Sequence, residues 1–220
     1  TDIDFHVDGI VLSGARIRKR AIEHAATYVP VVVASDPLRS TKVDTLHNDD
    51  HLGAALVVDH LVELGHRRIV HIDGGNGAGA KERKAGYVEA MQRHGLVPNV
   101  VPGVFTEASG VDAAELALKQ EAPFTAVFAG NDKSALGALD ALDAAGRRVP
   151  DDVSLVGYDN TFVAALRHIG LTTIDQGRDR IGRLAVEMLI ERVEHGRTDA
   201  RHLTTAPTLV VRNTTAPPRD

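Results

Sequence analysis

Two side chains suited to binding a small polar ligand lie just beyond two consecutive apolar segments of this chain. Asn131 follows the apolar segment 126–129, and Asp159 follows the apolar segment 153–156. Between them, apolar residues recur at helical spacing up to Gly146, so the stretch predicts strand, turn, helix, turn and strand. Because ligands bind at the carboxyl ends of strands in an open parallel sheet, we expect an amide and a carboxylate at that edge.

The same arrangement recurs along the chain. If the strands are all parallel, these polar ends converge on one edge and form a cleft built from several loops, which is the usual form of a small-molecule site. Five predicted strands end in glycine or polar residues, namely at Ser13, Ser35–Asp36, Asp73–Gly74, Asn131–Asp132 and Asp159.

The glycine-rich segment GGNGAG at 74–79 follows a predicted strand and precedes a helix, as a nucleotide-binding loop does. Its glycines do not fit the dinucleotide pattern GxGxxG, and Ala80 separates Gly79 from Lys81, which breaks the phosphate-loop pattern. We therefore interpret the segment as a flexible loop of the ligand cleft and expect no nucleotide cofactor.

His47 and His51, with Asn48, Asp49 and Asp50 between them, look like a metal cluster because the two imidazoles are four residues apart. The segment spans a loop and the start of a helix, where Asn and Asp are expected as caps. We expect caps and no metal. The sequence also lacks a GxSxG elbow and paired apolar-flanked carboxylates, so no enzyme is predicted.

The pattern of the whole chain predicts an α/β fold made of parallel strands joined by helices. Strands are expected at 7–12, 31–34, 68–72, 100–105, 126–129, 153–156, 171–174 and 208–212, with a short one near 43–46, and the main helices at 16–28, 51–64, 81–94, 110–121 and 178–195.

Composition bounds the function further. The 220 residues are 43% hydrophobic and carry a net charge of −5, which argues against a nucleic-acid surface within them. No apolar segment approaches the length of about 20 residues that a membrane span needs. Zero cysteines exclude disulfides and fit a cytoplasmic protein.

Taken together, the motifs of this chain resemble the effector-binding domain of the lactose-repressor/galactose-repressor (LacI/GalR) family of bacterial transcription regulators. The matching motifs cover almost the whole chain in the family's order: VDGIVLSG (7–14), VPVVVASD (29–36), HLVELGHRRIVHIDGG (60–75), RKAGYVEAMQRHG (83–95), AVFAGNDKSALGALDAL (126–142), VPDDVSLVGYDN (149–160), LTTIDQ (171–176) and TLVVRNTT (208–215).

The resemblance implies two doubly wound parallel-sheet subdomains of periplasmic-binding-protein type with a ligand cleft between them. The N-terminal subdomain would take 1–48 and 175–205, and the C-terminal one 49–174 and 206–220. It also implies a homodimer, and a helix–turn–helix and first β/α units that this chain does not contain. We expect that a segment of the protein precedes it, because a sheet without its first strands would expose an edge.

Carried over from the family, the effector contacts fall on Arg83, Asn131, Asp159 and Gln176, with Phe105 as an aromatic wall. Ser35 stands where several sugar-responsive members have an acidic residue, and Asn48 lies at a crossover between subdomains. Arginine, amide and carboxylate groups suit the hydroxyls of a sugar or sugar derivative, and an aromatic face suits its ring or a nucleobase.

Structural alternatives exist for the polar residues of this set. Asp159 can be a helix cap after a strand, and Arg83 can be a solvated helix residue like its charged neighbours. For the adjacent pair Asn131 and Asp132, we assign Asn131 to the ligand and Asp132 to capping.

Three functions remain open at this point. The leading one is the effector-sensing domain of a transcription regulator that binds operator DNA through an absent N-terminal head. The second is a periplasmic solute-binding protein of a sugar transporter, which a secretory signal upstream would indicate. The third is a nucleotide-dependent enzyme, for which the loop at 74–79 is the only support.

Overall fold

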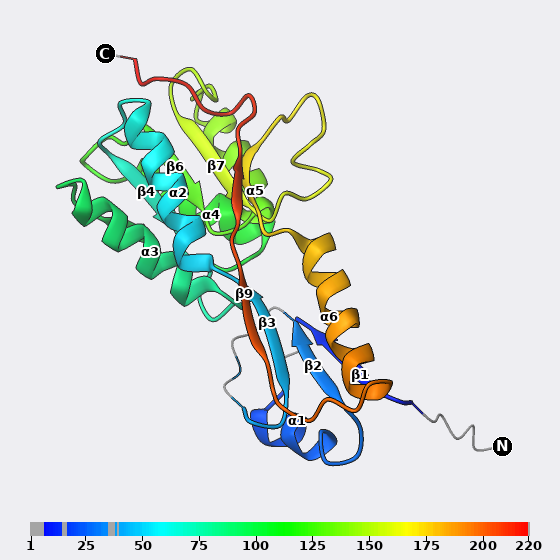
Figure 1. Cartoon of the computed structure of the whole chain (residues 1–220). Coiled ribbons are helices and arrows are strands. Elements are labelled where there is room, and N and C mark those ends of the chain that lie inside the picture. The colour runs from blue at the N-terminus through cyan, green and yellow to red at the C-terminus, as the bar shows by residue number, and fades with distance from the viewer. Residues whose placement is uncertain (1–6, 15–16, 35–37, 39, 220) are drawn as a thin grey trace. The chain divides into compact units, whose positions relative to one another are not determined.

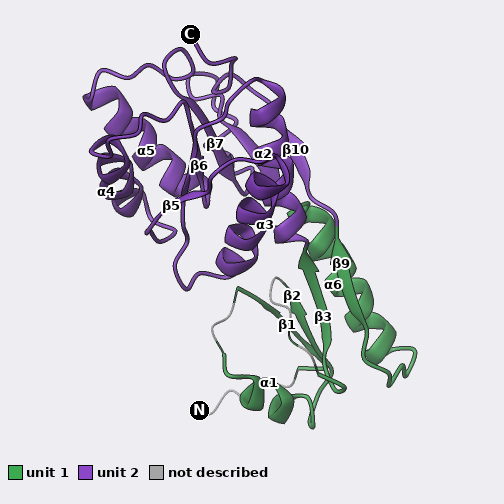
Figure 2. Ribbon diagram, turned by 90° about the vertical axis from the view of Figure 1, so that its left-hand side faces the viewer, with its two compact units in different colours: residues 1–48, 177–205 green, residues 49–176, 206–220 purple. Residues whose placement is uncertain are grey.

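Strands and helices alternate along the chain and assemble into two units (Figure 1). The computed structural model describes residues 7–14, 17–34, 38 and 40–219. Unit 1 contains residues 1–48 and 177–205, and unit 2 contains residues 49–176 and 206–220 (Figure 2). Asp175 and Gln176, which the family resemblance placed in the N-terminal subdomain, group with unit 2.

Unit 2 is built on a six-stranded sheet with the order β10-β8-β7-β6-β4-β5. Neighbouring strands are parallel except for β10, which pairs with β8 in the antiparallel direction. The strands are β4 (Ile69–Ile72), β5 (Asn99–Val101), β6 (Ala126–Ala129), β7 (Ser154–Tyr158), β8 (Thr172–Asp175) and β10 (Thr208–Val210), and the helices are α2 (Asp50–Glu63), α3 (Ala80–Arg93), α4 (Glu107–Leu118) and α5 (Asp132–Ala144).

Helices cover both faces of this sheet, which explains why its central strands are apolar at successive positions. On one face α2 and α3 pack Leu61 and Met91 into a cluster that includes Phe128 of β6. On the other face α4 and α5 pack small residues such as Ala114 and Ala138 into a second cluster. This cluster includes apolar residues of β4, β6 and β7. The helices therefore bury both faces of the sheet, and polar groups are left for the ends of its strands.

Unit 1 has a four-stranded sheet with the order β1-β2-β3-β9, and all of its pairs are parallel. Ile181, Ala185 and Met188 of α6 form a core with β2 and β3, while Ile22 of α1 belongs to a second core with other residues of these strands. The elements are β1 (Ile10–Ser13), α1 (Lys19–Ala25), β2 (Val31–Ala34), β3 (Asp44–Asn48), α6 (Arg178–Val193) and β9 (His202–Thr205).

Several predicted boundaries were wrong for local reasons. The helix expected at 110–121 begins at Glu107 because the Thr106 hydroxyl accepts a hydrogen bond from the Ser109 amide and caps it. The strand expected at 100–105 is only Asn99–Val101. It ends before Pro102, which has no amide hydrogen to donate to a ladder. The helix expected at 16–28 is the shorter α1.

Strand β9 was not predicted, because three of its four residues, His202–Thr205, are polar and three of the four are exposed. It is an edge strand whose place is set by pairing with β3 and not by burial. Edge strands of this kind carry no alternating apolar pattern, so the sequence alone gives little signal for them.

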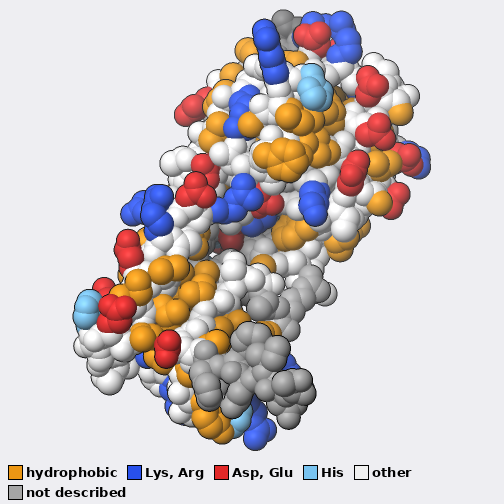
Figure 3. Space-filling view, turned by 90° about the vertical axis from the view of Figure 1, so that its right-hand side faces the viewer, with side chains coloured by type: hydrophobic (Ala, Val, Ile, Leu, Met, Phe, Trp, Pro, Cys, Tyr) orange, Lys and Arg blue, Asp and Glu red, His pale blue; other side chains and the backbone are white. Residues whose placement is uncertain are grey.

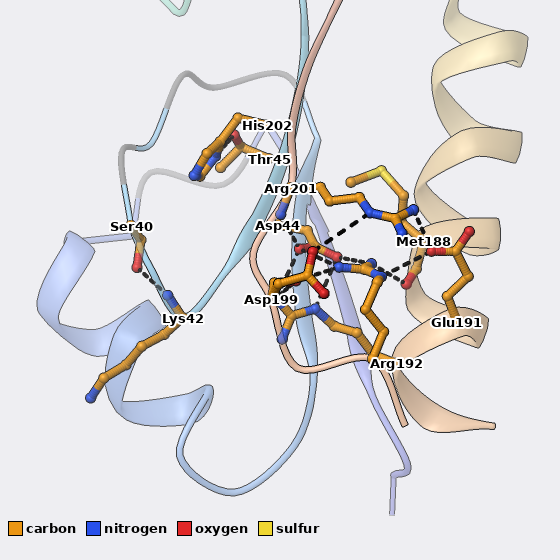
Figure 4. A network of polar contacts seen from close by, with 11 residues as sticks. Ser40, Lys42, Asp44, Thr45, Met188, Glu191, Arg192, Asp199, Arg201 and His202 are labelled. Atoms are coloured by element: carbon orange, nitrogen blue, oxygen red, sulfur yellow. Dashed lines mark hydrogen bonds and ion pairs between the residues drawn. The ribbon is translucent and has the colours of Figure 1, made fainter. Parts of the chain in front are cut away.

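A buried carboxylate fastens the end of α6 and the segment after it to β3 (Figure 4). The side chain of Asp44 is fully buried and accepts two hydrogen bonds from Arg192, at 2.9 and 2.8 Å, and two from Arg197. The Arg201 amide donates a further one at 2.8 Å. Burial alone would raise the pKa of Asp44, but the hydrogen bonds from Arg197 and Arg192 hold it below its ordinary value.

We expect Asp44→Ala to destabilise unit 1 by about 3–5 kcal/mol, because Arg192 and Arg197 would stay buried after losing the carboxylate that they share. Urea unfolding followed by circular dichroism measures this. Asp199→Ala is the control, since that side chain is 72% exposed. The Asp44 contribution is present above pH 3.8 and is lost as the pH falls through the lowered folded-state pKa. A loss below 1 kcal/mol for Asp44→Ala would contradict the assignment.

Candidate functional site

The polar strand ends of unit 2 do meet at one edge of its sheet. β4 leads into Asp73, β6 into Asn131 and β7 into Asp159, and these three strands are neighbours in parallel register. Lys84 of α3 lies 3.3 Å from the Asp73 carboxylate. The carboxyl edge predicted from the sequence is therefore the place where charged and amide side chains collect.

Arg83 is the central side chain of this edge. It projects from α3, is 5% exposed, and its Nε donates to the Asp50 carboxylate at 2.9 Å. Its terminal nitrogen donates to the Gly130 carbonyl at 2.7 Å and lies 3.9 Å from the Asp159 carboxylate. Burial alone would lower the pKa of Arg83, but the carboxylates of Asp50 and Asp159 raise it. Arg83 is thus a permanently charged, buried anchor and not a solvated helix residue.

Two aromatic rings face this guanidinium. Its central carbon lies 3.8 Å from the ring centroid of Tyr158 and 5.1 Å from that of Phe105. Both distances are within the range of cation–π attraction. Tyr158 is fully buried, whereas Phe105 is partly exposed. Phe105 therefore has both the position and the exposure that a wall for a bound ring requires.

The glycine-rich segment at 74–79 makes room for Phe105. A Cβ atom on Gly74 would lie 2.1 Å from the Phe105 ring, and one on Gly77 would lie 2.4 Å from it. Any side chain at these positions would displace the ring, so glycine is required there by close approach. Gly74 and Gly77 therefore make room for the Phe105 ring, whereas Gly79 lies against the Asp50 carboxylate.

The backbone of Asp159 is strained. Its φ is 114°, a value that residues with a Cβ rarely adopt, and the following Asn160 has a φ of 49°. The Gln176 side chain donates a hydrogen bond to the Asp159 carboxylate. Strain of this kind persists only where the surroundings enforce it, and it concentrates at functional sites. Asp159 is therefore not the simple helix cap that its position allowed.

The Asp132 carboxylate fixes the loop that follows Asp159, by binding Thr161 two residues further along the chain. This carboxylate is 1% exposed and accepts hydrogen bonds from the amide and hydroxyl of Thr161, at 2.7 and 2.8 Å, and from the Thr173 hydroxyl at 2.6 Å. Burial raises the pKa of Asp132, although the hydrogen bonds from Thr173 and Thr161 act in the opposite direction. The expectation that Asp132 caps a helix was wrong, since it holds the 159–161 loop from below.

Asn131 is the residue that caps α5. Its side-chain oxygen accepts from the Ser134 amide at 2.9 Å, and the Ser134 hydroxyl accepts in turn from the Asn131 amide, which completes a capping box. The side-chain nitrogen of Asn131 makes no hydrogen bond to the described residues. Its part in ligand binding is not tested by this arrangement, but that nitrogen remains available as a donor.

The two candidates from unit 1 are Ser35 and Asn48. Ser35 lies outside the described residues. Asn48 is the last residue of β3 and is 4% exposed. Asp49 accepts a hydrogen bond from the Leu52 amide at 2.9 Å, so it caps α2 as the sequence indicated.

The sequence pattern missed two members of the site, Asp50 and Tyr158. The sequence pattern indicates Asp50 only as part of a capping segment, and it places Tyr158 in the turn after the strand 153–156 without a contact to the ligand. The available signal was position: Tyr158 directly precedes Asp159, and Asp50 begins α2. Neither position reveals that the side chain meets Arg83, because that contact depends on how α2, α3 and β7 pack together.

In the described residues, no helix has both the length and the apolar character that crossing a membrane requires.

Comparison with known proteins places this geometry in a family. Residues 58–215 match the model of the periplasmic binding protein-like domain. The HTH-type transcriptional repressor PurR of Edwardsiella ictaluri is 35% identical over 219 residues, which cover 96% of this chain and 64% of that protein. The chain thus spans somewhat less than two thirds of the length of this relative.

Solved structures agree with this match. The crystal structure of a LacI transcriptional regulator from a Rhodococcus species has a TM-score of 0.91 at 39% identity and covers 96% of this chain and 78% of that one. A complex of the transcriptional regulator CelR with cellobiose has a TM-score of 0.85 at 34% identity, with 95% and 66% covered. A LacI-family regulator from Enterococcus faecium with bound ribose has a TM-score of 0.88 at 26% identity, with 97% and 81% covered. The chain therefore belongs to the LacI/GalR family of transcription regulators, within which it is an effector-binding domain of periplasmic-binding-protein-like fold.

Proposed function

We propose that this chain senses a small, uncharged, polyhydroxylated ligand at the carboxyl edge of unit 2. The observation that carries the proposal is the buried Arg83, fixed between the carboxylates of Asp50 and Asp159 beside the partly exposed Phe105 ring. Gln176 and Asn131 add amide groups to the same edge. Such a set offers directional hydrogen bonds to hydroxyls and a flat apolar face to a ring.

The charge of the site favours a neutral ligand. Two carboxylates, those of Asp50 and Asp159, face the single guanidinium of Arg83, so its positive charge is already compensated. A phosphate or carboxylate group placed here would meet surplus negative charge in a partly desolvated place. We therefore expect sugars in preference to sugar phosphates. A nucleoside is the second candidate, because Phe105 can also stack on a base.

The relatives support a sugar. Two of the similar solved regulators hold ribose and cellobiose. For this chain we assign Arg83, Asn131, Asp159, Gln176 and Phe105 to the ligand from unit 2, and Ser35 and Asn48 from unit 1, with no cofactor and no metal.

For the whole protein, we propose an effector-controlled repressor that works in the cytoplasm. Operator DNA would be bound by a helix–turn–helix region outside these 220 residues, and the chain itself would contribute no catalysis. The chain passes between its units at residues 48/49, 176/177 and 205/206. A ligand that favours one arrangement of the units over another would then shift operator affinity, and operator binding would shift ligand affinity reciprocally.

A ligand panel on the purified chain tests the site. We expect D-ribose, cellobiose or another neutral sugar to raise the melting temperature, and D-ribose 5-phosphate to have no such effect. Asp159→Asn should weaken binding of the active sugar at least tenfold, measured by calorimetry, because the amide has lost the negative charge and one of the two acceptor oxygens of this partly buried carboxylate. Glu115→Gln on the exposed face of α4 should bind normally. Stabilisation by amino acids alone, or equal affinity of Asp159→Asn, would refute the proposal.

The strain at Asp159 gives a separate test, which needs no ligand. Asp159→Gly should be more stable than Asp159→Ala by about 1–2 kcal/mol, because glycine adopts a φ of 114° without a Cβ conflict. Both variants lose the carboxylate, so urea unfolding isolates the backbone effect. At Asp140 in α5 the order should reverse by about 1 kcal/mol, since glycine weakens a helix. Equal stability of the two Asp159 variants would argue against a strained site.

We further propose that the protein is a homodimer and that unit 2 contributes a surface formed by Phe162 and Leu166. These side chains lie in the loop after β7 and are 81% and 39% exposed. That loop is on the side of the molecule that Figure 3 shows, where hydrophobic side chains gather among charged ones. Exposed apolar groups of this size are typical of surfaces that a partner covers.

The double variant Phe162→Glu, Leu166→Glu should shift the chain from dimer to monomer in sedimentation velocity, because like charges would face each other across the symmetric contact. Tyr28→Glu in unit 1, at a side chain that is 75% exposed, is the matched control and should leave the dimer intact. A dimer that survives the double variant would place the contact elsewhere.

A further inference from the structure

A second concave site lies at the opposite end of the strands that carry the proposed effector contacts. It is a groove of about 510 Å³ formed by the three loops that lead into β4, β5 and β6. These strands are neighbours in the sheet, so their amino ends form one continuous floor. The volume falls within the range of about 300–1,000 Å³ that is usual for small-molecule sites.

The walls of this groove are apolar. The loop before β5 contributes Leu96, Val97 and Pro98, and the loop before β6 contributes Pro123 and Phe124. Val97 is 85% exposed, which is unusual for a branched apolar side chain next to other apolar groups. The walls would therefore favour the burial of a small apolar body.

The rim of the groove is cationic. Arg67 and Arg68, in the loop before β4, both line it, and no Asp or Glu does. Arg67 donates through one terminal nitrogen to the carbonyls of Val62 and His66, each at 3.1 Å, and Arg68 donates through Nε to the Pro123 carbonyl. Neutral carbonyls thus hold both guanidiniums in place, and no described carboxylate forms an ion pair with either one.

This concentration of charge stands out in a chain with a net charge of −5. A guanidinium has five N–H donors in a planar fork, and the bonds described above engage one nitrogen of each. The remaining donors of two adjacent guanidiniums suit an oxyanion, and a planar carboxylate can accept from them in pairs. The only side-chain amide that lines the groove is that of Asn99, and the other lining residues apart from the two arginines are apolar or glycine, so a sugar is a poor match.

We propose that this groove is a second ligand site, which binds a small apolar carboxylate with its acid group at Arg67 and Arg68 and its apolar body against Val97 and Phe124. The site is independent of the proposed effector site, because none of its lining residues belongs to the carboxyl edge. A ligand there would contact the amino end of β4, whose other end leads to Asp73.

The probe is 3-phenylpropionate, titrated into the ¹⁵N-labelled 220-residue chain and followed by amide shifts in two-dimensional NMR. We expect saturable shifts at residues 67–70, 95–97, 99, 122, 124 and 125, which leaves out the two prolines of the groove because they have no amide hydrogen. The neutral analogue 3-phenylpropionamide should bind at least tenfold more weakly. Arg67→Gln and Arg68→Gln, made separately in case one of them disturbs folding, should each weaken the acid at least fivefold. Arg183→Gln in unit 1 removes the same charge elsewhere and should change nothing.

Three results would overturn the proposal. The first is an absence of saturable shifts at the groove up to 20 mM probe. The second is equal binding of the acid and the amide, or equal binding to both arginine variants and the unaltered chain. The third is a set of groove shifts that appears on concentrating the chain without probe, since that would make the groove a contact between copies. Saturation of the carboxyl edge with an active sugar should not displace the acid, which separates this test from that of the proposed function.

Discussion

The ligand edge of unit 2 depends on one buried cation. Arg83 is 5% exposed and reaches two carboxylates and a backbone carbonyl that come from α2, the end of β6 and the end of β7. Removing the Arg83 guanidinium would leave the carboxylates of Asp50 and Asp159 close together without a counter-charge. The free energy lost in this way is larger than the net stabilisation that the ion pairs provide when they are intact. Arg83 therefore fixes the distances between elements of this edge that are far apart in sequence, as the apolar clusters do for the sheet.

That fixed cation explains why strain is tolerated beside it. Asp159 has a φ of 114°, and it is bonded to Gln176 and lies near Arg83, while Asp132 holds Thr161 two residues further along the loop. Each restraint by itself is worth only about 1 kcal/mol, comparable with the cost of the strained backbone. Together they leave the Asp159 carboxylate little freedom, so a bound ligand would not have to order it.

The sequence predicted what local pattern determines and missed what depends on distant partners. Periodicity and glycine caps located most helices and strands, and strand ends marked Asn131 and Asp159. By contrast, β9 has no apolar alternation, and Asp44 meets Arg197 across 153 positions. The capping role went to Asp132 in the sequence-based prediction because both residue types cap helices, whereas Asn131 is the cap, and only the packing of β8 decides that Asp132 is bonded to Thr173. The requirement for glycine at positions 74 and 77 could not be predicted either, because it arises from contact with the Phe105 ring, which belongs to another loop.

The two ends of the sheet in unit 2 also carry different charged groups, because different loops form them. Loops that follow the strands carry Asp73 and Asp159, whereas a loop that precedes β4 carries Arg67 and Arg68. β4 and β6 have four residues each, so the two ends are about 13 Å apart. Salt screens charges at the solvent-exposed rims over about 8 Å, so exposed charges at one end act weakly on ligands at the other. Any further coupling between the two ends would pass through the packed strands.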